Sequence, residues 1–467
     1  MSVDFGTSSS AAAVIIRRKP ELVTPIMIDA VGAKIFPTVA YVDNQREIHT
    51  CHQADLLKGN DLSRYLREFK LDLNWETLPV VNVSYVEVVS KILETLRNSA
   101  IQTLNGDVVD SIIITIPAIY DSTDIRIGIM RAAATDAGFK KVEIIKEAEA
   151  AAIYYDYLES NSNGISLVYD LGGGTFDPAL IKHNTGQYEL LGKGRGVPVG
   201  GKFFTERITK HYIKTNQLND AQRKGVSFKC EDIKRYLTYN EKWDFPVEEE
   251  GRENYVLTRH DFEDMIGNTL DRTIESCSQL IGSVNLEWKD ISRILMVGGS
   301  CYIPLVIKKI QRKLDSVQAS QVRIVKRETE SGKQFDPQFA VALGGSIYAM
   351  NRFMAPPPRP QLGYIEYIEL ERPKIYHLHE GDNVLGREAK GYTVDIPLST
   401  DDMKMSRKHF IIKVQFIPEK NEYEYTAQDI STNGTYVNKT RIKGCQRLHN
   451  EDIITASSSN VVIRFMN

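Results

Sequence analysis

Hydrophobic and polar positions follow two different periods along the first three quarters of the chain. Short apolar runs at residues 111–116, 165–169 and 294–297 predict buried strands. Residues 84–104, 124–137 and 259–281 instead carry the apolar spacing of three and four residues that predicts helices. Strands that alternate with long helices are typical of α/β architecture. The pattern therefore predicts a large α/β region.

Beyond residue 361 the pattern changes to short strand-like runs separated by turn signals. The predicted strands cover residues 364–370, 375–378, 409–416, 422–427 and 461–465. Turns are predicted at residues 380–382 and 432–434, which contain glycine beside aspartate or asparagine. Short strands with regular turns predict a small all-β sandwich in this part of the chain.

The composition changes most sharply at residues 355–360, which read APPPRP. Proline has a fixed φ and no amide N–H, so this run excludes helix and favours an extended spacer. We expect an α/β domain over residues 1–354, a proline-rich linker over residues 355–361 and a β-sandwich over residues 362–467. A length of 467 residues is sufficient for this organisation.

Charge and cysteine usage narrow the class of protein. The net charge is -3 and the isoelectric point about 6.4, so no positive field favours a nucleic-acid backbone or an anionic membrane. The five cysteines lack CxxC spacing and predict neither a disulfide framework nor a zinc site. The apolar run at residues 11–16 is too short for a signal sequence or a membrane span. We expect a cytoplasmic protein with no nucleic-acid partner and no membrane span.

Two loops within the α/β region have similar sequences. Residues 3–8 read VDFGTS and residues 169–175 read YDLGGGT, so that each strand ends in aspartate, glycine and a hydroxyl residue. Glycine lets backbone N–H groups approach phosphate oxygens, and the hydroxyls of Thr7, Ser8 and Thr175 add donors. Either loop alone is equally compatible with an ordinary glycine hairpin. Together they predict a phosphate cradle between two similar lobes.

Carboxylates accompany both loops. Asp4 ends the first strand, and Asp170 and Asp177 flank the second glycine run. Magnesium in proteins is commonly held by a few carboxylates together with substrate phosphates. The sequence therefore predicts that Asp4, Asp170 and Asp177 form a magnesium site, through direct contact or through water.

Residues 168–177, which read VYDLGGGTFD, resemble the second phosphate motif of the DnaK-type heat-shock chaperones in the actin-like ATPase superfamily. Further segments resemble that family in the same order: ITIPA at 114–118, IIKEAEAAA at 144–152, VGGKFF at 199–204, CEDIKR at 230–235 and VGGS at 297–300. The resemblance extends to about residue 351. It implies a two-lobed actin-like ATPase fold over residues 1–354 that binds ATP or ADP with Mg²⁺.

The resemblance also implies which residues contact the nucleotide. The contacts on the phosphate side are Asp4, Gly6, Thr7, Ser8, Gly172, Gly173, Gly174, Gly200 and Gly201. The contacts on the adenosine side are Glu231, Lys234, Arg235, Gly298, Gly299 and Ser300. The spacing of Glu231, Lys234 and Arg235 places all three on one helical face, for which a solvated charged surface is the alternative interpretation.

Lys70, Glu147, Asp170 and Thr175 are the catalytic candidates that the resemblance implies. Lys70 would stabilise charge on the transferred phosphoryl group, with Arg67 as a competing choice, and Glu147 would position the attacking water. The four candidates predict a slow ATPase whose nucleotide state opens or closes the lobes.

Three departures from the family pattern affect this prediction. Ala148 replaces a proline, Tyr302 replaces an arginine, and Pro178 follows Asp177. Because proline removes a ladder donor, the strand that contains Pro178 is expected to be an edge strand or locally bent. A catalytically inactive nucleotide-binding scaffold therefore remains the alternative function, and the helix around Glu231 disfavours a small-molecule kinase.

Three motifs mark the β-rich region: LGR at residues 385–387, MSRKHF at 405–410 and DISTNGTYVN at 429–438. In this order they resemble the forkhead-associated (FHA) domain, which implies phosphothreonine binding. The resemblance assigns phosphate contacts to Arg387, Ser406 and Arg407, loop support to Thr432, and a bond to the ligand backbone to Asn433. His409 is expected to brace the loop rather than contact the ligand.

The FHA-like region stands where the DnaK-type chaperones carry a leucine-rich linker and a peptide-binding domain. The sequence therefore predicts a switch rather than a refolding chaperone. We expect the partner to be a phosphothreonine-containing protein, either a Ser/Thr kinase or a substrate of one.

Overall fold

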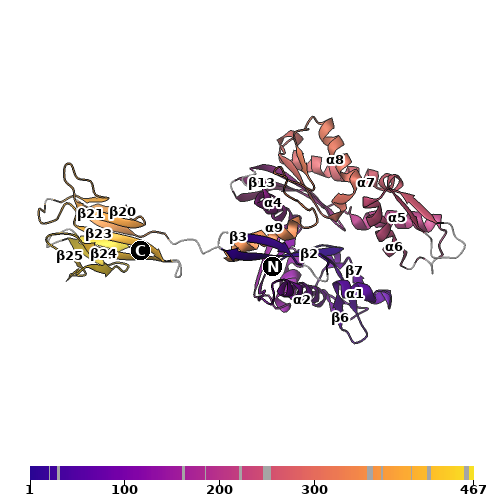
Figure 1. Ribbon diagram of the computed structural model, residues 1–467, viewed down its shortest axis with the longest axis horizontal. Helices are drawn as coiled ribbons and strands as arrows, with labels where there is room; N and C mark the ends of the chain where they lie inside the picture. The colour runs from indigo at the N-terminus through magenta and orange to yellow at the C-terminus, as the bar shows by residue number, and fades with distance from the viewer. Residues whose placement is uncertain are drawn as a thin grey trace. The chain divides into compact units, whose positions relative to one another are not determined.

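The computed structural model describes residues 1–19, 22–28, 32–159, 163–184, 186–219, 223, 225–245, 254–354, 361–369, 372–400, 402–417, 422–456 and 462–466. The chain divides into two compact units, Met1–Met354 and Ala355–Asn467 (Figure 1). The proline-rich linker expected at residues 355–361 lies outside the described residues except for Gln361.

The first lobe of unit Met1–Met354 is built on a mixed sheet in the order β11-β10-β1-β2-β3, with β4 also paired to β2. Its strands are β1 (Ser2–Phe5), β2 (Ser9–Lys19), β3 (Leu22–Met27), β4 (Ile35–Pro37), β10 (Ser111–Ile116) and β11 (Lys141–Lys146). β1 runs parallel to β10 and antiparallel to β2. Residues 112–116 of β10 are all buried, as expected for a continuous apolar run covered on both faces.

Helices α2 (Tyr85–Thr103) and α3 (Ile125–Asp136) share a hydrophobic core with β1 and β10. Ser84 starts α2 with a capping box, because its hydroxyl accepts from the Glu87 N–H while the Glu87 carboxylate accepts from the Ser84 N–H. The remaining elements of this lobe are α1 (Cys51–Leu57), β5 (Val39–Val42), β6 (Ile48–Thr50), β7 (Tyr65–Arg67), β8 (Thr77–Leu78) and β9 (Val83–Ser84).

The second lobe repeats this topology with the sheet order β14-β13-β12-β17-β18. Its strands are β12 (Gly164–Leu171), β13 (Phe176–Asn184), β14 (Gln187–Lys193), β17 (Arg293–Val297) and β18 (Arg323–Val325). β12 runs antiparallel to β13 and parallel to β17, as β1 does to β2 and β10. The other elements are α5 (Gly201–Thr215), α6 (Val226–Tyr239), α7 (Arg259–Ser283), α8 (Pro304–Ser316), β15 (Lys242–Phe245) and β16 (Tyr255–Thr258).

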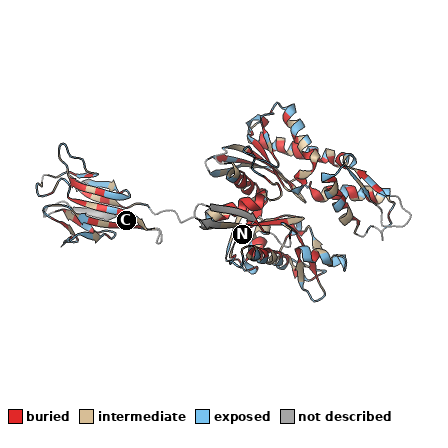
Figure 2. Ribbon diagram, viewed as in Figure 1, coloured by how far each residue is buried: buried red, intermediate tan, exposed pale blue. Residues whose placement is uncertain are grey.

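Helices α4 (Glu147–Leu158) and α9 (Ala340–Ala349) share one apolar core with strands of both sheets. Figure 2 shows buried residues along these helices in the middle of the unit. A Cβ atom at Gly344 of α9 would lie 1.8 Å from the carbonyl oxygen of Ala150 in α4, so the two backbones approach as closely as glycine allows. This contact helps to fix α4, whose first residue is Glu147.

Unit Ala355–Asn467 is all-β among the described residues and consists of two sheets over one core. The sheet order is β20-β19-β29-β28-β25-β26 in one and β22-β21-β23-β24-β27 in the other. The strands are β19 (Tyr364–Glu369), β20 (Arg372–His377), β21 (Gly381–Arg387), β22 (Ile396–Leu398), β23 (Phe410–Ile417), β24 (Glu422–Asp429), β25 (Thr435–Val437), β26 (Thr440–Arg441), β27 (Cys445–Arg447), β28 (Ile453–Ala456) and β29 (Val462–Met466). Alternate residues of β23 and β24 point into the core.

The predicted fold class, an α/β two-lobed region followed by an all-β sandwich, is confirmed. The prediction of an edge strand at Pro178 is wrong, because β13 lies between β12 and β14. The proline is tolerated because pairing with β14 begins only at Ala179, while the Pro178 carbonyl still accepts from the Gly194 N–H over 2.8 Å. The register shifts between Leu180 and Ile181, which agrees with the alternative of a locally bent strand.

Candidate functional site

The two glycine loops are β-hairpin turns that face each other across the lobes. The first joins β1 to β2 and the second joins β12 to β13, and both hairpins are antiparallel. A Cβ atom at Gly173 would lie 2.4 Å from Ser8 Oγ, and one at Gly174 would lie 3.1 Å from Thr7 Oγ1. The loops therefore lie so close together that any larger side chain would clash, which explains the run of glycines at residues 172–174.

A cavity of about 90 Å³ lies between these turns. The predicted site residues that line it are Asp4, Gly6, Thr7, Ser8, Lys70, Glu147, Asp170, Gly172, Gly173, Gly174, Thr175, Asp177, Gly298 and Gly299. No site role was expected from the sequence for its other lining residues, which are Ser9, Ser10, Ala11, Ile35, Pro117, Val297 and Gln338. Residues as far apart as 4 and 338 thus reach one small space.

Lys70 and Glu147 form a buried ion pair in this cavity. Lys70 Nζ lies 3.2 Å from Glu147 Oε1, and the two residues are only 5% and 8% exposed. Burial alone would lower the pKa of the Lys70 ammonium, but the charge and hydrogen bond of Glu147, together with Tyr120 and Asp4, outweigh this effect and raise the pKa. Arg67, the competing choice, lies elsewhere and donates to Ser227 Oγ over 3.2 Å.

Three aspartates complete the acidic side of the cavity. Burial raises the pKa of Asp4 to about 7, with a further contribution from the charge of Glu147. Burial, followed by the charges of Glu147 and Asp177, holds the pKa of Asp170 well above its usual range. Burial likewise raises the pKa of Asp177 to about 6, although the Thr175 hydroxyl donates to this carboxylate over 2.5 Å.

These raised pKa values show that ionising all the carboxylates together is unfavourable when Lys70 is the cation beside them. A hard divalent cation prefers carboxylate oxygens and would offset this repulsion. The carboxylate type of these donors suits Mg²⁺, and Asp4, Asp170 and Asp177 are the residues that would hold it. Their oxygens do not all lie within 4.8 Å of one another, so part of the contact would be made through water.

Two of the predicted adenosine residues, Lys234 and Ser300, donate hydrogen bonds to backbone carbonyls of the glycine turns. Glu231 accepts hydrogen bonds from Lys234 Nζ (2.6 Å) and Arg235 Nε (3.0 Å). Lys234 Nζ also donates to the carbonyl of Gly201, and Ser300 Oγ donates to the carbonyl of Gly172 over 2.8 Å.

The glycine turn that starts α5 supports the second phosphate loop instead of lining the cavity. The N–H of Gly201 donates to the Gly172 carbonyl (3.1 Å), and a Cβ atom at Gly200 would lie 2.8 Å from the same oxygen. Glu231 and Arg235 line a second cavity, of about 340 Å³, which opens between the lobes. The structure thus divides the predicted adenosine residues: Gly298 and Gly299 line the phosphate cavity, Glu231 and Arg235 line the second cavity, and Lys234 and Ser300 line neither.

The predicted phosphothreonine residues lie on neighbouring loops of unit Ala355–Asn467. The backbone N–H of Arg387 donates to the Ser406 carbonyl (3.0 Å), and its Nε donates to the Met405 carbonyl (3.2 Å). Within the described part of the chain, no hydrogen-bond partner occupies its two terminal nitrogens. The Thr432 N–H donates to Ser406 Oγ over 3.4 Å, so the two loops are joined.

His409 is fully buried behind these loops. Its Nδ1 accepts from the Ser406 N–H (2.9 Å), and its Nε2 lies 3.1 Å from the Gly434 carbonyl. Burial lowers the pKa of His409, so the neutral ring that accepts on one side and donates on the other is favoured. This geometry agrees with the predicted bracing role.

Asn433 and Arg407 make contacts that the motifs did not predict. Asn433 Nδ2 donates to the Lys404 carbonyl over 2.7 Å, which leaves Oδ1 as the atom that can accept from a ligand backbone. The Arg407 guanidinium lies 4.1 Å from the ring centre of Tyr392, an exposed side chain on the loop after β21. The contact between Arg407 and Tyr392 could not be predicted from the sequence, because the loops that carry these residues come together only in the folded domain.

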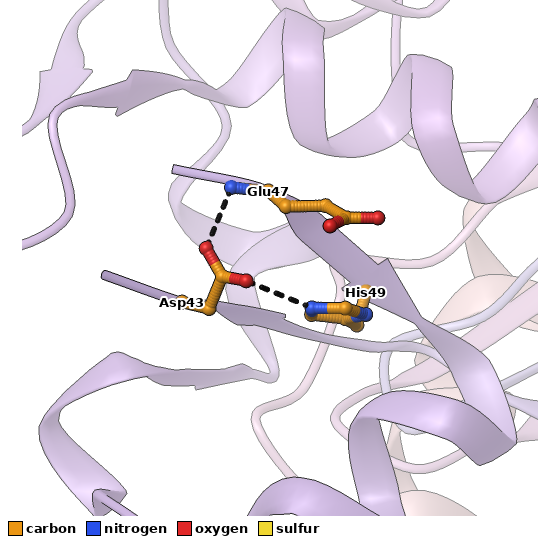
Figure 3. Close-up of side chains that lie close together, drawn as sticks. All are labelled: Asp43, Glu47 and His49. Carbon is orange, nitrogen blue, oxygen red and sulfur yellow. Dashed lines mark hydrogen bonds and ion pairs between the residues drawn. The ribbon is translucent and has the colours of Figure 1, made fainter. Parts of the chain in front are cut away.

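Asp43, Glu47 and His49 form a further cluster of ionisable side chains at the β5–β6 hairpin (Figure 3). Asp43 Oδ1 accepts from the backbone N–H groups of Gln45 and Glu47, and Oδ2 lies 3.3 Å from His49 Nε2. The aspartate therefore stabilises the turn by an Asx-type interaction, and we assign no ligand to this cluster.

No helix among the described residues is long and apolar enough to cross a membrane.

Comparison with known proteins agrees with both units. Residues 72–348, more than half of the chain, match the family model described as Hsp70 protein, and residues 383–457 match the FHA domain. The Hsp70 match begins after Asp4 and Lys70, which line the same cavity as the matched residues Glu147 and Asp170.

Similar curated proteins include chaperone protein HscA homologs. The one from Histophilus somni (strain 129Pt) is 31% identical over 57% of this chain and 41% of its own length. The one from Herminiimonas arsenicoxydans is 28% identical over 75% of this chain and 57% of its own length. The chaperone protein HscA of Buchnera aphidicola subsp. Schizaphis graminum is 32% identical over 51% of this chain and 40% of its own length. The chain thus spans about 40–57% of the length of these relatives.

The predicted resemblances to a DnaK-type nucleotide-binding region and to an FHA domain are confirmed by these matches. Two observations support one family assignment. The two similar lobes carry facing glycine hairpins, and residues 72–348 match the family model. This chain belongs to the Hsp70 protein family and carries a C-terminal FHA domain.

Proposed function

We propose that unit Met1–Met354 binds ATP with Mg²⁺ and hydrolyses it slowly. The observation that carries this proposal is the one cavity that both hairpin turns, the buried Lys70–Glu147 pair and three half-buried aspartates line together. Membership of the Hsp70 family supports it, because Hsp70 proteins are ATPases that bind ATP with Mg²⁺.

The hairpin turns would bind the phosphates. Backbone N–H groups of Gly173 and Gly174 and the hydroxyl of Thr7 can donate to phosphate oxygens, since these residues line the cavity. The Gly172 N–H and the Thr175 hydroxyl already donate to the Thr175 carbonyl and to Asp177, and so shape the turn instead. Asp4, Asp170 and Asp177 would hold Mg²⁺, which when bound supplies positive charge that offsets the phosphate charge.

Lys70 and Glu147 have separate roles in this proposal. Lys70 Nζ stabilises negative charge on the transferred phosphoryl group. Glu147 accepts a hydrogen bond from a water molecule and orients it in line with the terminal phosphorus atom, so that the new O–P bond forms as the bond to the ADP oxygen breaks. The fixed position of Glu147 at the start of α4 makes this orientation reproducible.

An inactive nucleotide-binding scaffold is the second candidate. It is favoured by Ala148 and Tyr302, which replace a proline and an arginine that the family resemblance implies beside Glu147 and Ser300. The two candidates differ in turnover and not in ATP binding.

ATP binding is tested by filling the cradle between the hairpins. Gly173→Ala places a Cβ atom 2.4 Å from Ser8 Oγ, whereas Gly267→Ala in α7 adds the same atom to open space. We expect calorimetry with Mg²⁺ to show ATP affinity reduced more than about tenfold in Gly173→Ala, a loss of about 1.4 kcal/mol, and unchanged in Gly267→Ala. Equal affinity of both variants and the unmodified chain would contradict the proposed phosphate site.

We further propose that the FHA domain directs the chain to a phosphothreonine-containing protein, such as a Ser/Thr kinase or a substrate of one. Arg387 supplies a cation with unused donors, and Ser406 and Asn433 lie on loops joined to it. A library of immobilised phosphothreonine peptides should retain the full-length chain, and phosphatase treatment should abolish retention. Retention that survives phosphatase treatment would exclude phosphate-dependent recognition.

The two units together would form a phosphorylation-guided switch. Cross-lobe contacts such as Lys202 Nζ to Glu68 Oε2 (2.8 Å) hold the lobes of the first unit together. A nucleotide that contacts both lobes favours the closed state in proportion to its differential affinity for that state. The FHA domain would select the partner on which this switch acts.

A further inference from the structure

A surface groove of about 530 Å³ lies beside helix α8, at the edge of the second lobe (Figure 1). Helix α8 forms one wall, and the segment that directly follows β18, the edge strand of the sheet, forms the other. Its lining residues are Pro304, Ile307, Lys308, Gln311, Arg312 and Lys326. The groove shares no lining residue with the phosphate cavity or with the cavity lined by Glu231 and Arg235, so it is a separate feature of this lobe.

The groove is strongly cationic. Three of its six lining side chains are cations, and none of these described lining residues is a carboxylate. Lys308 Nζ lies 3.3 Å from Glu263 Oε2, so its charge is partly neutralised. Arg312 and Lys326 instead have no hydrogen-bonding or ion-pair partner within the part of the chain that the structure describes. Two unpaired cations therefore line the same groove.

The surroundings of Lys326 favour the arrival of an anion. This residue is half-buried, and the neighbouring Arg327 is exposed. Burial, followed by the charge of Arg327, lowers the pKa of the Lys326 ammonium. A negatively charged group in the groove would stabilise the charged form of Lys326 and offset its repulsion with Arg327.

The spacing of these groups suits a peptide better than a single small anion. Lys308 and Arg312 are four residues apart and so share one face of α8, about 6 Å apart along the helix axis. Lys326 reaches the groove from a different segment, and Pro304 and Ile307 add apolar surface to it. An extended chain with carboxylates at intervals and an apolar side chain between them could contact all of these groups.

We propose that this groove binds an acidic peptide segment of a partner protein, in which carboxylates are interspersed with apolar side chains. Clusters of basic side chains that include arginine recognise acidic motifs, because the guanidinium can form two parallel hydrogen bonds with one carboxylate. This site goes beyond the proposed ATPase and the proposed phosphothreonine recognition, since it uses residues of neither.

The experiment measures peptide binding by the full-length chain with fluorescence anisotropy. The probe is a short labelled peptide with the repeat Glu-Glu-Leu, and its neutral counterpart has the repeat Gln-Gln-Leu. We expect Arg312→Glu/Lys326→Glu to weaken binding of the acidic peptide roughly 5- to 100-fold, because attractions between charges become repulsions. Arg312→Gln/Lys326→Gln, which only removes the charges, should weaken it roughly threefold to tenfold. Salt at about 1 M, where the Debye length is about 3 Å, should weaken binding to the unmodified chain.

A matched control separates the groove from the net charge of the chain. Lys140→Glu/Lys141→Glu makes the same change of charge at two exposed lysines of the first lobe, where β11 begins. This variant should bind the acidic peptide within about twofold of the unmodified chain, because charges far from the groove are screened. An unchanged midpoint of thermal unfolding shows that each variant is folded, and the glutamine pair replaces the glutamate pair if charge reversal disturbs packing.

Several outcomes would overturn the proposal. They are no binding of the acidic peptide to the unmodified chain, equal binding of the acidic and neutral peptides, and an equal loss in the groove and control variants. Binding of phosphatidylserine vesicles in place of the peptide would assign the groove to an anionic membrane surface instead. Neither ATP nor a phosphothreonine peptide enters this test, so its failure leaves the proposed functions of those two sites unchanged.

Discussion

The proposed nucleotide site and the proposed phosphothreonine site both bind phosphate groups, but with opposite arrangements. The proposed nucleotide site lies in a cavity between the lobes, and its residues come from stretches of chain between residues 4 and 338. The phosphothreonine site lies on surface loops within residues 387–433, with Thr432, Asn433 and Arg407 exposed. The nucleotide site therefore forms only when distant parts of the chain come together, whereas the phosphothreonine site is formed by neighbouring loops at one end of the sandwich.

This difference changes the electrostatics of the two sites. The nucleotide site concentrates carboxylates whose pKa values are raised by burial, so it requires a bound cation to be fully ionised. The phosphothreonine site relies on a permanently charged guanidinium and on neutral donors. We therefore expect metal and pH to control the first site, and a single arginine to control the second.

The largest expected effect concerns Glu147. Glu147→Gln keeps the size of the side chain but replaces one carboxylate oxygen by an NH2 group and removes the negative charge. The remaining amide oxygen is a weaker acceptor for the attacking water, so ATP hydrolysis should fall by about 100-fold or more. ATP affinity should change far less, because the phosphate contacts remain. Steady-state phosphate release and calorimetry measure the two quantities separately. Glu149→Gln, two residues later on α4 and outside the cavity lining, is the control and should hydrolyse ATP normally. A background rate that Glu147→Gln leaves unchanged would support the inactive scaffold.

The next effect concerns Arg387. Charge-assisted hydrogen bonds contribute about 1.5–3 kcal/mol each, so Arg387→Ala should weaken phosphothreonine-peptide binding roughly 10- to 100-fold. Fluorescence anisotropy with a peptide selected from the library measures this loss. Arg447→Ala, which removes an arginine of β27 that pairs with Glu424 at 3.4 Å, should bind normally. If both variants lost affinity equally, a diffuse charge effect rather than the predicted contact would explain binding.

A smaller effect concerns the pH dependence of stability, which should arise at the nucleotide site and not at the phosphothreonine site. Because burial raises the pKa of Asp4 to about 7 and of Asp177 to about 6, the folded chain holds protons that the unfolded chain has released. Without metal, the free energy of unfolding should therefore fall as the pH rises from about 4 to 7. Asp4→Asn should remove part of this dependence and stabilise the metal-free chain by about 1–2 kcal/mol at pH 8.

Urea denaturation at pH 6 and pH 8, with and without Mg²⁺, measures this effect. Mg²⁺ should stabilise the chain more at pH 8, where it competes with fewer protons. Asp264→Asn, which changes an exposed carboxylate of α7, should leave the pH dependence intact. A pH dependence that Asp4→Asn does not alter would mean that other groups carry it.

Sequence patterns predicted those features that depend on local chemistry. The hairpin turns at Gly6 and Gly173, the helix start at Ser84 and the FHA loops follow from glycine, capping and turn residues close together in the chain. The similar sequences of the two hairpins also predicted two similar sheets, since the same strand–turn–strand unit occupies the middle of each.

Features that depend on contacts between distant segments could not be predicted from the sequence. The interior position of β13 could not be predicted from Pro178, because tolerance of the proline depends on where pairing with β14 starts. The hydrogen bond between Tyr302 and Asp336 joins side chains 34 residues apart. The contacts between the two lobes could not be predicted for the same reason. Removing one of them should give the smallest effect that we predict.

Phe228 of α6 is held by the opposite lobe. Its ring centre lies 4.7 Å from the Arg67 guanidinium, 5.0 Å from Lys58 Nζ, and 5.9 Å from the Tyr65 ring in an edge-to-face arrangement. Exposed contacts of this kind contribute about 0.5–1 kcal/mol each. Phe228→Ala should therefore favour the open lobes and accelerate release of a fluorescent ATP analogue by roughly threefold to tenfold in stopped-flow measurements.

Phe203 provides a matched control for this last prediction. The Arg207 guanidinium also lies 4.7 Å from its ring centre, but both residues belong to α5 within one lobe. Phe203→Ala removes the same type of contact without affecting lobe closure, so nucleotide release should keep its rate. Equal release rates for both variants would mean that closure does not depend on the Phe228 contact. Phosphopeptide binding by the FHA domain should be unaffected in either variant, because it uses only residues of its own sandwich.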